Sequence, residues 1–305
     1  MAPRQFDATT ESALRIEMLD FLADATVDQR DPITRLALEQ DFTFNGHPFK
    51  LIDRQRGIRK PTELSAALTI MTPFDRKKRF DYTDEIGDDG FLRYAWKGTD
   101  PNEGDNVGVR AAIDAAVPLA WFYGIAPAVF QAIFPVYIIG DEPTQHRFVV
   151  ATDATSGLYR PDSPIEAVLR RYVTRDSKVR LHQPVFRSRV LLAYEDRCAV
   201  CALGHRELLD AAHIDADSDG GAAAVANGLA LCKIHHAAYD SNILGITPDH
   251  DVKIRVDLLE EVDGPMLKHG LQERHNQPLM VIPRTRAARP DRGLLAARYE
   301  RFLIA

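Results

Sequence analysis

The sequence has few cysteines and no excess of positive charge. Only three of its 305 residues are cysteine, and all lie between positions 198 and 232. An odd number in one short region excludes the disulfide framework of a small secreted scaffold. Because 38 Lys and Arg face 44 Asp and Glu, a uniformly basic surface is excluded too, and nucleic-acid binding would need local patches. The N-terminus lacks the basic start and apolar run of a secretory signal, so we expect a cytoplasmic protein.

Long hydrophobic runs are also scarce. The stretch from Pro118 to Gly140 carries no charge and is long enough to cross a bilayer. Pro127, Pro135 and Gly124 interrupt it, which fits a continuous membrane helix badly. Its aromatic and β-branched residues are typical of buried strands, so we expect no membrane span.

The first half of the chain favours a mixed α+β fold. Residues 9–40 have the three- and four-residue apolar spacing of helices. Short segments rich in Val, Ile, Phe, Tyr and Trp follow, separated by turn residues, and predict strands. These segments are 47–53, 65–72, 91–98, 118–123, 134–141 and 146–153. With a helix expected at 106–116, they predict a β-rich curved sheet or open barrel.

A change of composition marks a domain boundary. Residues 155–164 are rich in Ser, Gly, Pro and Asp, and the stretch after them is predicted to be helical and basic. We therefore expect a first domain at 1–155, a basic helical linker at 156–182 and a second domain at 183–305. A second cluster of arginines, 284–301, lies near the C-terminus. Such clusters are typical of phosphate-binding surfaces and, equally, of ordinary solvated faces.

The three cysteines belong to two pairs of equal spacing. Cys198 and Cys201 form a C-x-x-C pair, and Cys232 and His235 form a C-x-x-H pair further along the chain. Three thiolates and one imidazole are the ligands of a closed tetrahedral zinc site. The alternative, that the cysteines are buried apolar residues, leaves the paired spacing unexplained. The spacing predicts structural zinc.

A second group of polar residues lies among these pairs, in the order His213, Asn227, His236. Residues 208–214 and 228–232 are predicted strands, and a helix is expected to start at 232. The segments AAHI, NGLALC and C-x-x-H-H-x-x-x-D resemble the HNH nuclease family, specifically its zinc-stabilised ββα-metal type. A helix like the one expected at 183–194 precedes the C-x-x-C pair in bacterial HNH proteins of restriction systems. The resemblance thus implies an endonuclease and a ββα-metal fold for the second domain.

The resemblance also implies roles for these residues. His213 would be the general base that takes a proton from water, which suits a group titrating near neutral pH. Asn227 would fix its orientation, and His236 with Asp240 would bind a catalytic Mg²⁺ or Mn²⁺ ion. The sequence departs from the family at Ala212, where many members have an acidic or histidine metal ligand. Asp210 or Asp215 could assist instead. The alternative for His213 is a core histidine that caps a loop.

The first domain has a shorter resemblance. SAALTIMTPFD and the later YAWKGT, with the helix after it, are similar to SRA domains, PUA-like modules that flip a modified cytosine out of duplex DNA. Base flipping needs aromatic side chains that stack on the extruded base and form the walls of its pocket. It also needs a carboxylate, the edge reader, that accepts hydrogen bonds from the cytosine edge. We expect Phe74 and Trp96 as walls and Asp75 as the edge reader, with Tyr94 and Tyr123 as alternatives. The opposing interpretation is that these aromatics belong to the core of the sheet.

Together these patterns predict a modification-dependent DNA endonuclease that acts on duplex DNA carrying 5-methylcytosine or 5-hydroxymethylcytosine. The predicted DNA contacts are Arg56, Arg59 and Lys60 in a glycine-containing loop, and Arg187 in the helix before the C-x-x-C pair. One catalytic centre cuts one strand, so a homodimer would suit a double-strand break. Two alternatives stay open: a non-catalytic zinc-containing reader of modified DNA, and an HNH nuclease with no preference for modification.

Overall fold

The computed structural model describes residues 5–53, 56–74, 91–152, 183–215 and 224–304. The chain divides into two units, residues 1–185 and 186–305, each with its own internal contacts. The expected linker at 156–182 lies outside the described residues, as does Asp75. Each unit is described by itself.

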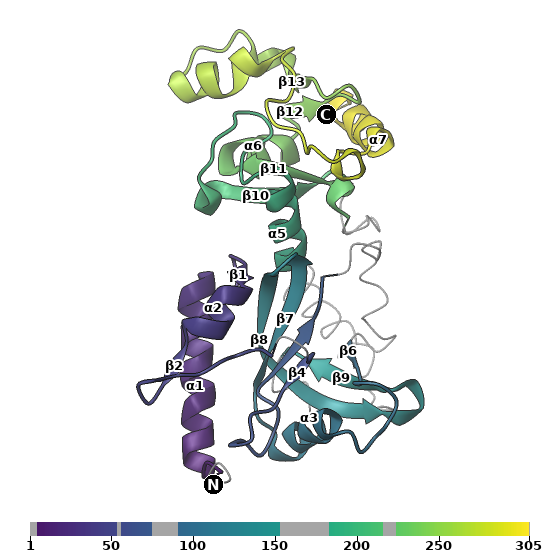
Figure 1. Cartoon of the computed structure of the whole chain (residues 1–305). Helices are drawn as coiled ribbons and strands as arrows, with labels where there is room; N and C mark the ends of the chain where they lie inside the picture. Colours follow the sequence, from purple (N-terminus) through teal and green to yellow (C-terminus); the bar gives the residue numbers. More distant parts are fainter. Residues whose placement is uncertain (1–4, 54–55, 75–90, 153–182, 216–223, 305) are drawn as a thin grey trace, which may run out of the picture. The chain divides into compact units, whose positions relative to one another are not determined.

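A seven-stranded sheet forms the centre of the first unit (Figure 1). Its strand order is β4-β5-β7-β8-β9-β6, and β1 also pairs with β8. The members are β1 (Ile33–Thr34), β4 (Ile58–Arg59), β5 (Thr69–Thr72), β6 (Leu92–Ala95), β7 (Leu119–Ala126), β8 (Val129–Glu142) and β9 (Arg147–Ala151). Neighbouring strands are antiparallel except β5 and β7. Register shifts in β7–β8 and at Ile138–Gly140 in β8–β9 increase the local twist, and the sheet curls into a half-barrel.

The helices of the first unit are α1 (Ala8–Thr26), α2 (Arg35–Gln40) and α3 (Gly104–Ala115). The side chain of Asp7 caps α1 by accepting a hydrogen bond from the Thr10 amide at 2.8 Å. Leu14, Met18 and Leu22 repeat every four residues, so they lie on one face of α1. All three are fully buried in one hydrophobic cluster with Phe122 and Phe130 of the sheet. The mixed α+β fold with a curved sheet is confirmed.

The expected strand at 47–53 is much shorter than predicted. Only His47–Pro48 is a strand, β3, which pairs with β2 (Thr43–Phe44). The amides of Phe49 and Leu51 donate to the carbonyls of Phe42 and Leu38. Because these bonds tie the segment back to α2 and the residues after it, no strand partner is left for it in the sheet.

The uncharged stretch 118–140 forms a β-hairpin. β7 and β8 pair along it, and the chain turns at Pro127 and Ala128. Ala128 has a φ of 60°, in the left-handed region that tight turns use. Within the described parts of the chain, no helix has the length and apolar character needed to cross a bilayer.

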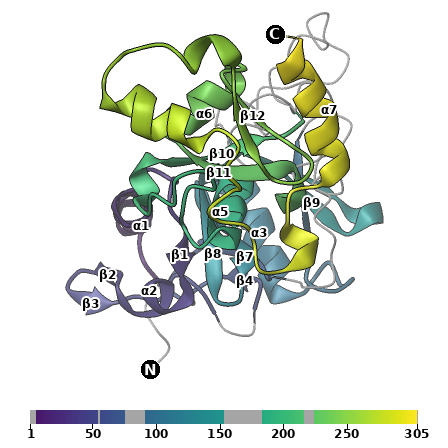
Figure 2. The same cartoon turned by 90° about the horizontal axis from the view of Figure 1, so that it is seen from above.

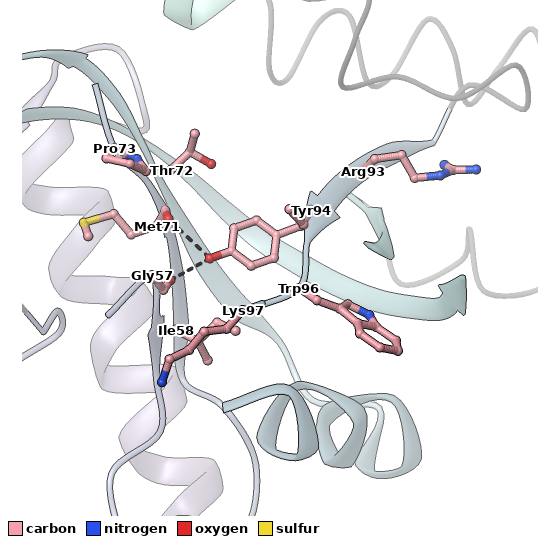
Figure 3. Close-up of a pocket in the computed structure, with 10 residues that line it drawn as sticks. Gly57, Ile58, Met71, Thr72, Pro73, Arg93, Tyr94, Trp96 and Lys97 are labelled. Carbon is pink, nitrogen blue, oxygen red and sulfur yellow. Dashed lines mark hydrogen bonds between the residues drawn. The ribbon is translucent and has the colours of Figure 1, made fainter. Parts of the chain in front are cut away.

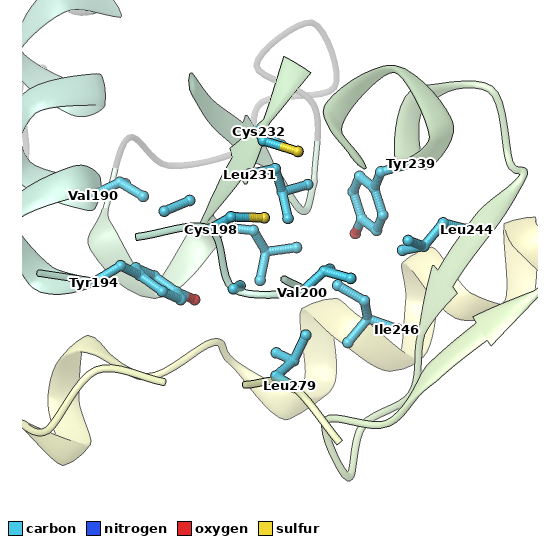
Figure 4. Close-up of a cluster of buried hydrophobic side chains, with 14 of the residues drawn as sticks. Val190, Tyr194, Cys198, Val200, Leu231, Cys232, Tyr239, Leu244, Ile246 and Leu279 are labelled. Carbon is cyan, nitrogen blue, oxygen red and sulfur yellow. The ribbon is translucent and has the colours of Figure 1, made fainter. Parts of the chain in front are cut away.

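The second unit places a strand pair and a helix around one core. α5 (Gln183–Ala193) leads into it, and β10 (Leu209–His213) pairs antiparallel with β11 (Gly228–Cys232). α6 (Lys233–Asp240) follows β11 at once and contacts both strands (Figure 2). β12 (Leu244–Ile246) and β13 (Val252–Ile254) form a second hairpin, against which α7 (Arg292–Leu303) packs. The core contains Tyr194, Leu231, Tyr239 and Leu279 beside Cys198 and Cys232 (Figure 4).

Candidate active site

The two cysteine-containing pairs meet in the second unit. The ligand atoms of Cys198, Cys201, Cys232 and His235 all lie within 4.8 Å of one another. Nδ1 of His235 is 3.4 Å from Sγ of Cys198 and 3.1 Å from Sγ of Cys232. Its other ring nitrogen, Nε2, is 2.7 Å from the carbonyl oxygen of Gly270. This contact directs Nδ1 toward the sulfurs, as the outer hydrogen bond of a metal-bound histidine does.

The chemistry of these four residues fits a zinc ion. Burial alone would lower the pKa of His235, but hydrogen bonds with Cys201 and Cys232 raise it to about 10. Hydrogen bonds from Cys198 and Cys201 lower the pKa of Cys232 below its ordinary value. Thiolate character so close to an imidazole is what a Zn²⁺ ion stabilises, and metal binding then replaces the shared protons.

His213 ends the first strand of the pair, and Asn227 stands just before the second. Strand pairing places His213 opposite Gly228. The buried side chain of Asn227 accepts a hydrogen bond from the amide of Asp215 at 2.9 Å and donates to its carbonyl at 3.1 Å. The backbone carbonyl of Asn227 accepts from the amide of Ile214 at 2.9 Å. Asn227 therefore orders the backbone directly after His213.

His236 lies between two carboxylates. Its Nε2 is 3.4 Å from Asp240 one helical turn later, and its Nδ1 is 4.0 Å from Asp210 in β10. Burial would raise the pKa of Asp210, but the hydrogen bond from Lys233 and the charges of Lys233, Arg187 and His236 hold it below its ordinary value. Asp210 is thus an ionised group facing His236.

The two candidate helpers for a catalytic ion differ in their surroundings. Asp215 pairs with Arg301 at 3.2 Å, whereas Asp210 faces His236. Ala212 is fully buried, so the position before His213 contributes no ligand. Among the residues that the structure describes, the Cys₃His group is the only set of three or more ligand residues at mutual metal-binding distance.

A pocket opens in the first unit where the edges of the half-barrel approach each other (Figure 3). Its volume is about 280 Å³. It is lined by residues of β4, β5 and β6 and their flanks: Gly57, Ile58, Met71, Thr72, Pro73, Arg93, Tyr94, Ala95, Trp96 and Lys97. The hydroxyl of Tyr94 donates to the carbonyl of Gly57 at 2.7 Å and is 3.2 Å from that of Met71. Tyr94 therefore joins the two sheet edges beside the pocket.

The indole of Trp96 points away from the ring of Tyr94 (Figure 3). Its Nε1 donates to Asp141 at 2.9 Å, and the guanidinium of Arg110 lies 4.5 Å from its ring centroid. Phe74 is half-buried next to Pro73, which lines the pocket. A wall role for Trp96 would require the indole to leave Asp141 and Arg110. Tyr123, the other alternative, is buried in β7.

The predicted DNA contacts are arranged in two groups. Arg56 is exposed and pairs with Asp105 at 3.5 Å, while Nε of Arg59 donates to the carbonyl of Lys50 at 3.4 Å. The side-chain carbons of Lys60 pack against Gly108. In the second unit, Arg187 donates to Asp210 at 3.2 Å.

Lys97 is a charged pocket residue that the sequence did not predict. Lys97 lines the pocket, and its ammonium contacts Glu103 and Asp105 at 2.6 Å each. The hydrogen bonds that its ammonium donates to Asp105 and Glu103 raise the pKa of Lys97. The available signal was its place in YAWKGT, directly after Trp96.

The bonds of Tyr94 give a stability prediction. Tyr94→Phe is expected to lower the free energy of unfolding of the first unit by about 0.5–1.5 kcal/mol, because the carbonyl of Gly57 loses the hydroxyl donor while keeping the amide of Met71. Both tryptophans, Trp96 and Trp121, lie in this unit, so denaturation followed by tryptophan fluorescence reports on it alone. Tyr137→Phe is the matched control, since its half-buried hydroxyl makes no hydrogen bond within the described residues. Equal stability of both variants would contradict the prediction.

Comparison with known proteins identifies the class of the second unit. Residues 198–247 match the HNH endonuclease family. The chain therefore contains an HNH endonuclease domain, and the protein is an endonuclease. The comparison with curated proteins gave no match.

Two solved structures are similar at low identity. One, the modification-dependent TagI restriction endonuclease, is 18% identical, with 81% of this chain and 85% of that chain covered and a TM-score of 0.29. The other, the type IV phosphorothioation-dependent restriction endonuclease ScoMcrA, is 15% identical, with 61% of this chain covered and a TM-score of 0.23. The chain spans 48% of the length of ScoMcrA.

Proposed function

We propose that this endonuclease is a modification-dependent enzyme of the restriction type. Its first unit would select DNA that carries 5-methylcytosine or 5-hydroxymethylcytosine, and its second unit would hydrolyse the phosphodiester bond. The observation that carries the proposal is the combination in one chain of an HNH endonuclease domain with a separate half-barrel that holds its own pocket. Since an HNH domain supplies the hydrolysis, the half-barrel is free to select the substrate.

In the proposed hydrolysis, His213 takes a proton from the attacking water while the water oxygen forms its bond to phosphorus and the bond from phosphorus to the leaving oxygen breaks. Asn227 holds the backbone after His213 and so keeps the imidazole in place. His236 and Asp240 would hold Mg²⁺ or Mn²⁺, with ionised Asp210 near enough to assist. Such an ion supplies Lewis-acid stabilisation of the leaving oxygen. Ala212 stands where many members of the family have a metal ligand just before the base. Asp210 is therefore the proposed replacement for that ligand.

Structural zinc completes the proposal for the second unit. Cys198, Cys201, Cys232 and His235 would hold it, and this set is distinct from the residues around His236. Since His235 and His236 are neighbours in α6, the zinc would also fix the setting of the helix that presents His236.

The pocket of the half-barrel is the proposed site of the modified base. A volume of about 280 Å³ lies at the lower end for ligand pockets, which suits one nucleobase. Tyr94 supplies an aromatic surface already held edge-on against Trp121, with ring centroids 5.7 Å apart. Phe74 and Trp96 stay proposed walls, and Asp75 the proposed edge reader. Arg56, Arg59, Lys60 and Arg187 are the proposed contacts to the DNA backbone, and a homodimer would supply two catalytic centres.

The test is a cleavage assay on matched duplexes containing cytosine, 5-methylcytosine or 5-hydroxymethylcytosine, with Mg²⁺ or Mn²⁺. We expect cutting of modified duplexes at least about tenfold faster than of the unmodified one, the ratio that about 1.4 kcal/mol of selective binding gives. The control is His213→Ala on the same duplexes. Equal cutting of all three would leave the HNH reaction in place and discard the modified-base role of the pocket. It would favour a nuclease without modification preference.

A further inference from the structure

A phenylalanine of α5 lies flat against the imidazole of His213. The ring centroids of Phe186 and His213 are 3.9 Å apart and the ring planes differ by 10°. We propose that Phe186 is a positioning residue for the catalytic base, which holds the imidazole and stabilises its protonated form. This inference rests on the proposed role of His213 as the general base.

The stacked geometry provides a cation–π contact for a charged imidazole. A centroid separation of 3.9 Å at nearly parallel planes puts the faces of the two rings in van der Waals contact. A cation gains from lying over the face of an aromatic ring. The arrangement therefore suits the imidazolium that forms when His213 takes a proton.

Phe186 is itself rigidly held. Its side chain is 2% exposed and belongs to the core cluster of the second unit, with Val190 and Leu229. His213 is only half-buried, so one imidazole face is covered by a core residue while the side chain keeps access to solvent. A stacked partner from the core restricts rotation of the imidazole and so keeps its nitrogens aimed.

A glycine allows this close approach. Gly228, opposite His213 in the strand pair, has an ordinary extended backbone. A β-carbon at this position would lie 2.4 Å from Cγ2 of Val190 and 2.9 Å from Cζ of Phe186. The absence of a side chain at 228 therefore lets α5 press its aromatic ring against the strand end that carries His213.

Other charged groups stand on the elements around this pair. Asp210 lies in β10 and Arg187 in α5, and these two are paired with each other. Asp215 follows β10 and pairs with Arg301 of α7. None of these pairs includes Phe186. A change at 186 therefore alters the contact on the face of the imidazole and leaves these ion pairs in place.

The test compares Phe186→Leu with Leu191→Ala, a fully buried residue of the same helix and core. The zinc-loaded full chain is assayed with Mg²⁺ for kcat and KM across the pH range. For Phe186→Leu we expect kcat about fivefold to thirtyfold lower with KM unchanged, the loss of a half-buried cation–π contact. The acidic limb of the kcat profile should move to lower pH, because an aliphatic neighbour stabilises the imidazolium less. Leu191→Ala should lose stability but keep the limb where it is.

Two further results decide the matter. If the profiles of the two variants coincide once corrected for folded fraction, Phe186 only packs and the inference is wrong. Phe186→Met, whose flexible side chain fills the same space, is measured in parallel so that a misfolded leucine variant leaves the test intact. If His213→Ala keeps cleaving, the base assignment has failed, whatever Phe186 does. A displaced limb in Phe186→Leu beside an inactive His213→Ala supports both.

Discussion

Replacing His213 with alanine is expected to reduce DNA cleavage by about 10²- to 10⁴-fold, the usual contribution of a general base. His213 ends β10 and is half-buried, so its loss leaves the strand pair and the zinc ligands unchanged. We therefore expect normal thermal unfolding and normal DNA affinity. Single-turnover cleavage with Mg²⁺, together with a binding assay without the divalent ion, measures both.

The matched control for this variant is His205→Ala. His205 lies in the same unit, is exposed and pairs only loosely with Glu207 at 3.6 Å. Its replacement should leave the cleavage rate within about twofold, as for most surface substitutions. Cleavage by His213→Ala at the rate of the control would refute the mechanism. Loss of DNA binding in His213→Ala would instead indicate a folding defect and call for His213→Gln.

Removing the zinc ligands is expected to unfold the second unit. Zinc binding to structural sites contributes about 10–16 kcal/mol, comparable with or larger than the whole stability of a small domain. Cys232→Ser, or chelation of the wild-type chain, should thus abolish the cooperative unfolding of this unit. One zinc per chain in the wild type, and none in the variant, is the expected metal analysis.

The tryptophans provide the internal control for zinc removal. Both lie in the first unit, so their fluorescence transition should persist in Cys232→Ser. His236→Ala is the second control, because it should keep its zinc and its fold while losing cleavage. A Cys232→Ser protein that retains the second unfolding transition would show that the core holds the unit without metal.

The sequence predicted the metal-ligand group better than the pocket, for a physical reason. Cys198 with Cys201 and Cys232 with His235 are local pairs, whose spacing determines their geometry before the rest of the fold is known. The strand pair and helix around them follow from equally local patterns, and the structure contains β10, β11 and α6 at those places.

The surroundings of Trp96 could not be read from the sequence in this way. Its indole contacts Arg110 of α3 and Asp141 of β8, and both contacts depend on how distant segments meet. The stacking of Phe186 on His213 is likewise set by Gly228, which carries no signal until α5 is known to pack there. Lys97 was missed because a lysine after a strand is ordinary in sequence, and only the closing of the half-barrel places it at a pocket.

The uncharged hairpin of the half-barrel is prone to aggregate before the chain has folded. From Pro118 to Gly140 no lysine, arginine or acid interrupts a run of strand-forming residues. Charged gatekeepers normally keep such segments from pairing between molecules. In the folded state β5, β9 and β1 cover the edges of β7 and β8, so the hazard exists only while these strands are still unpaired. Refolding at low protein concentration, and slow synthesis in a host cell, should therefore raise the yield of native enzyme at the expense of aggregates.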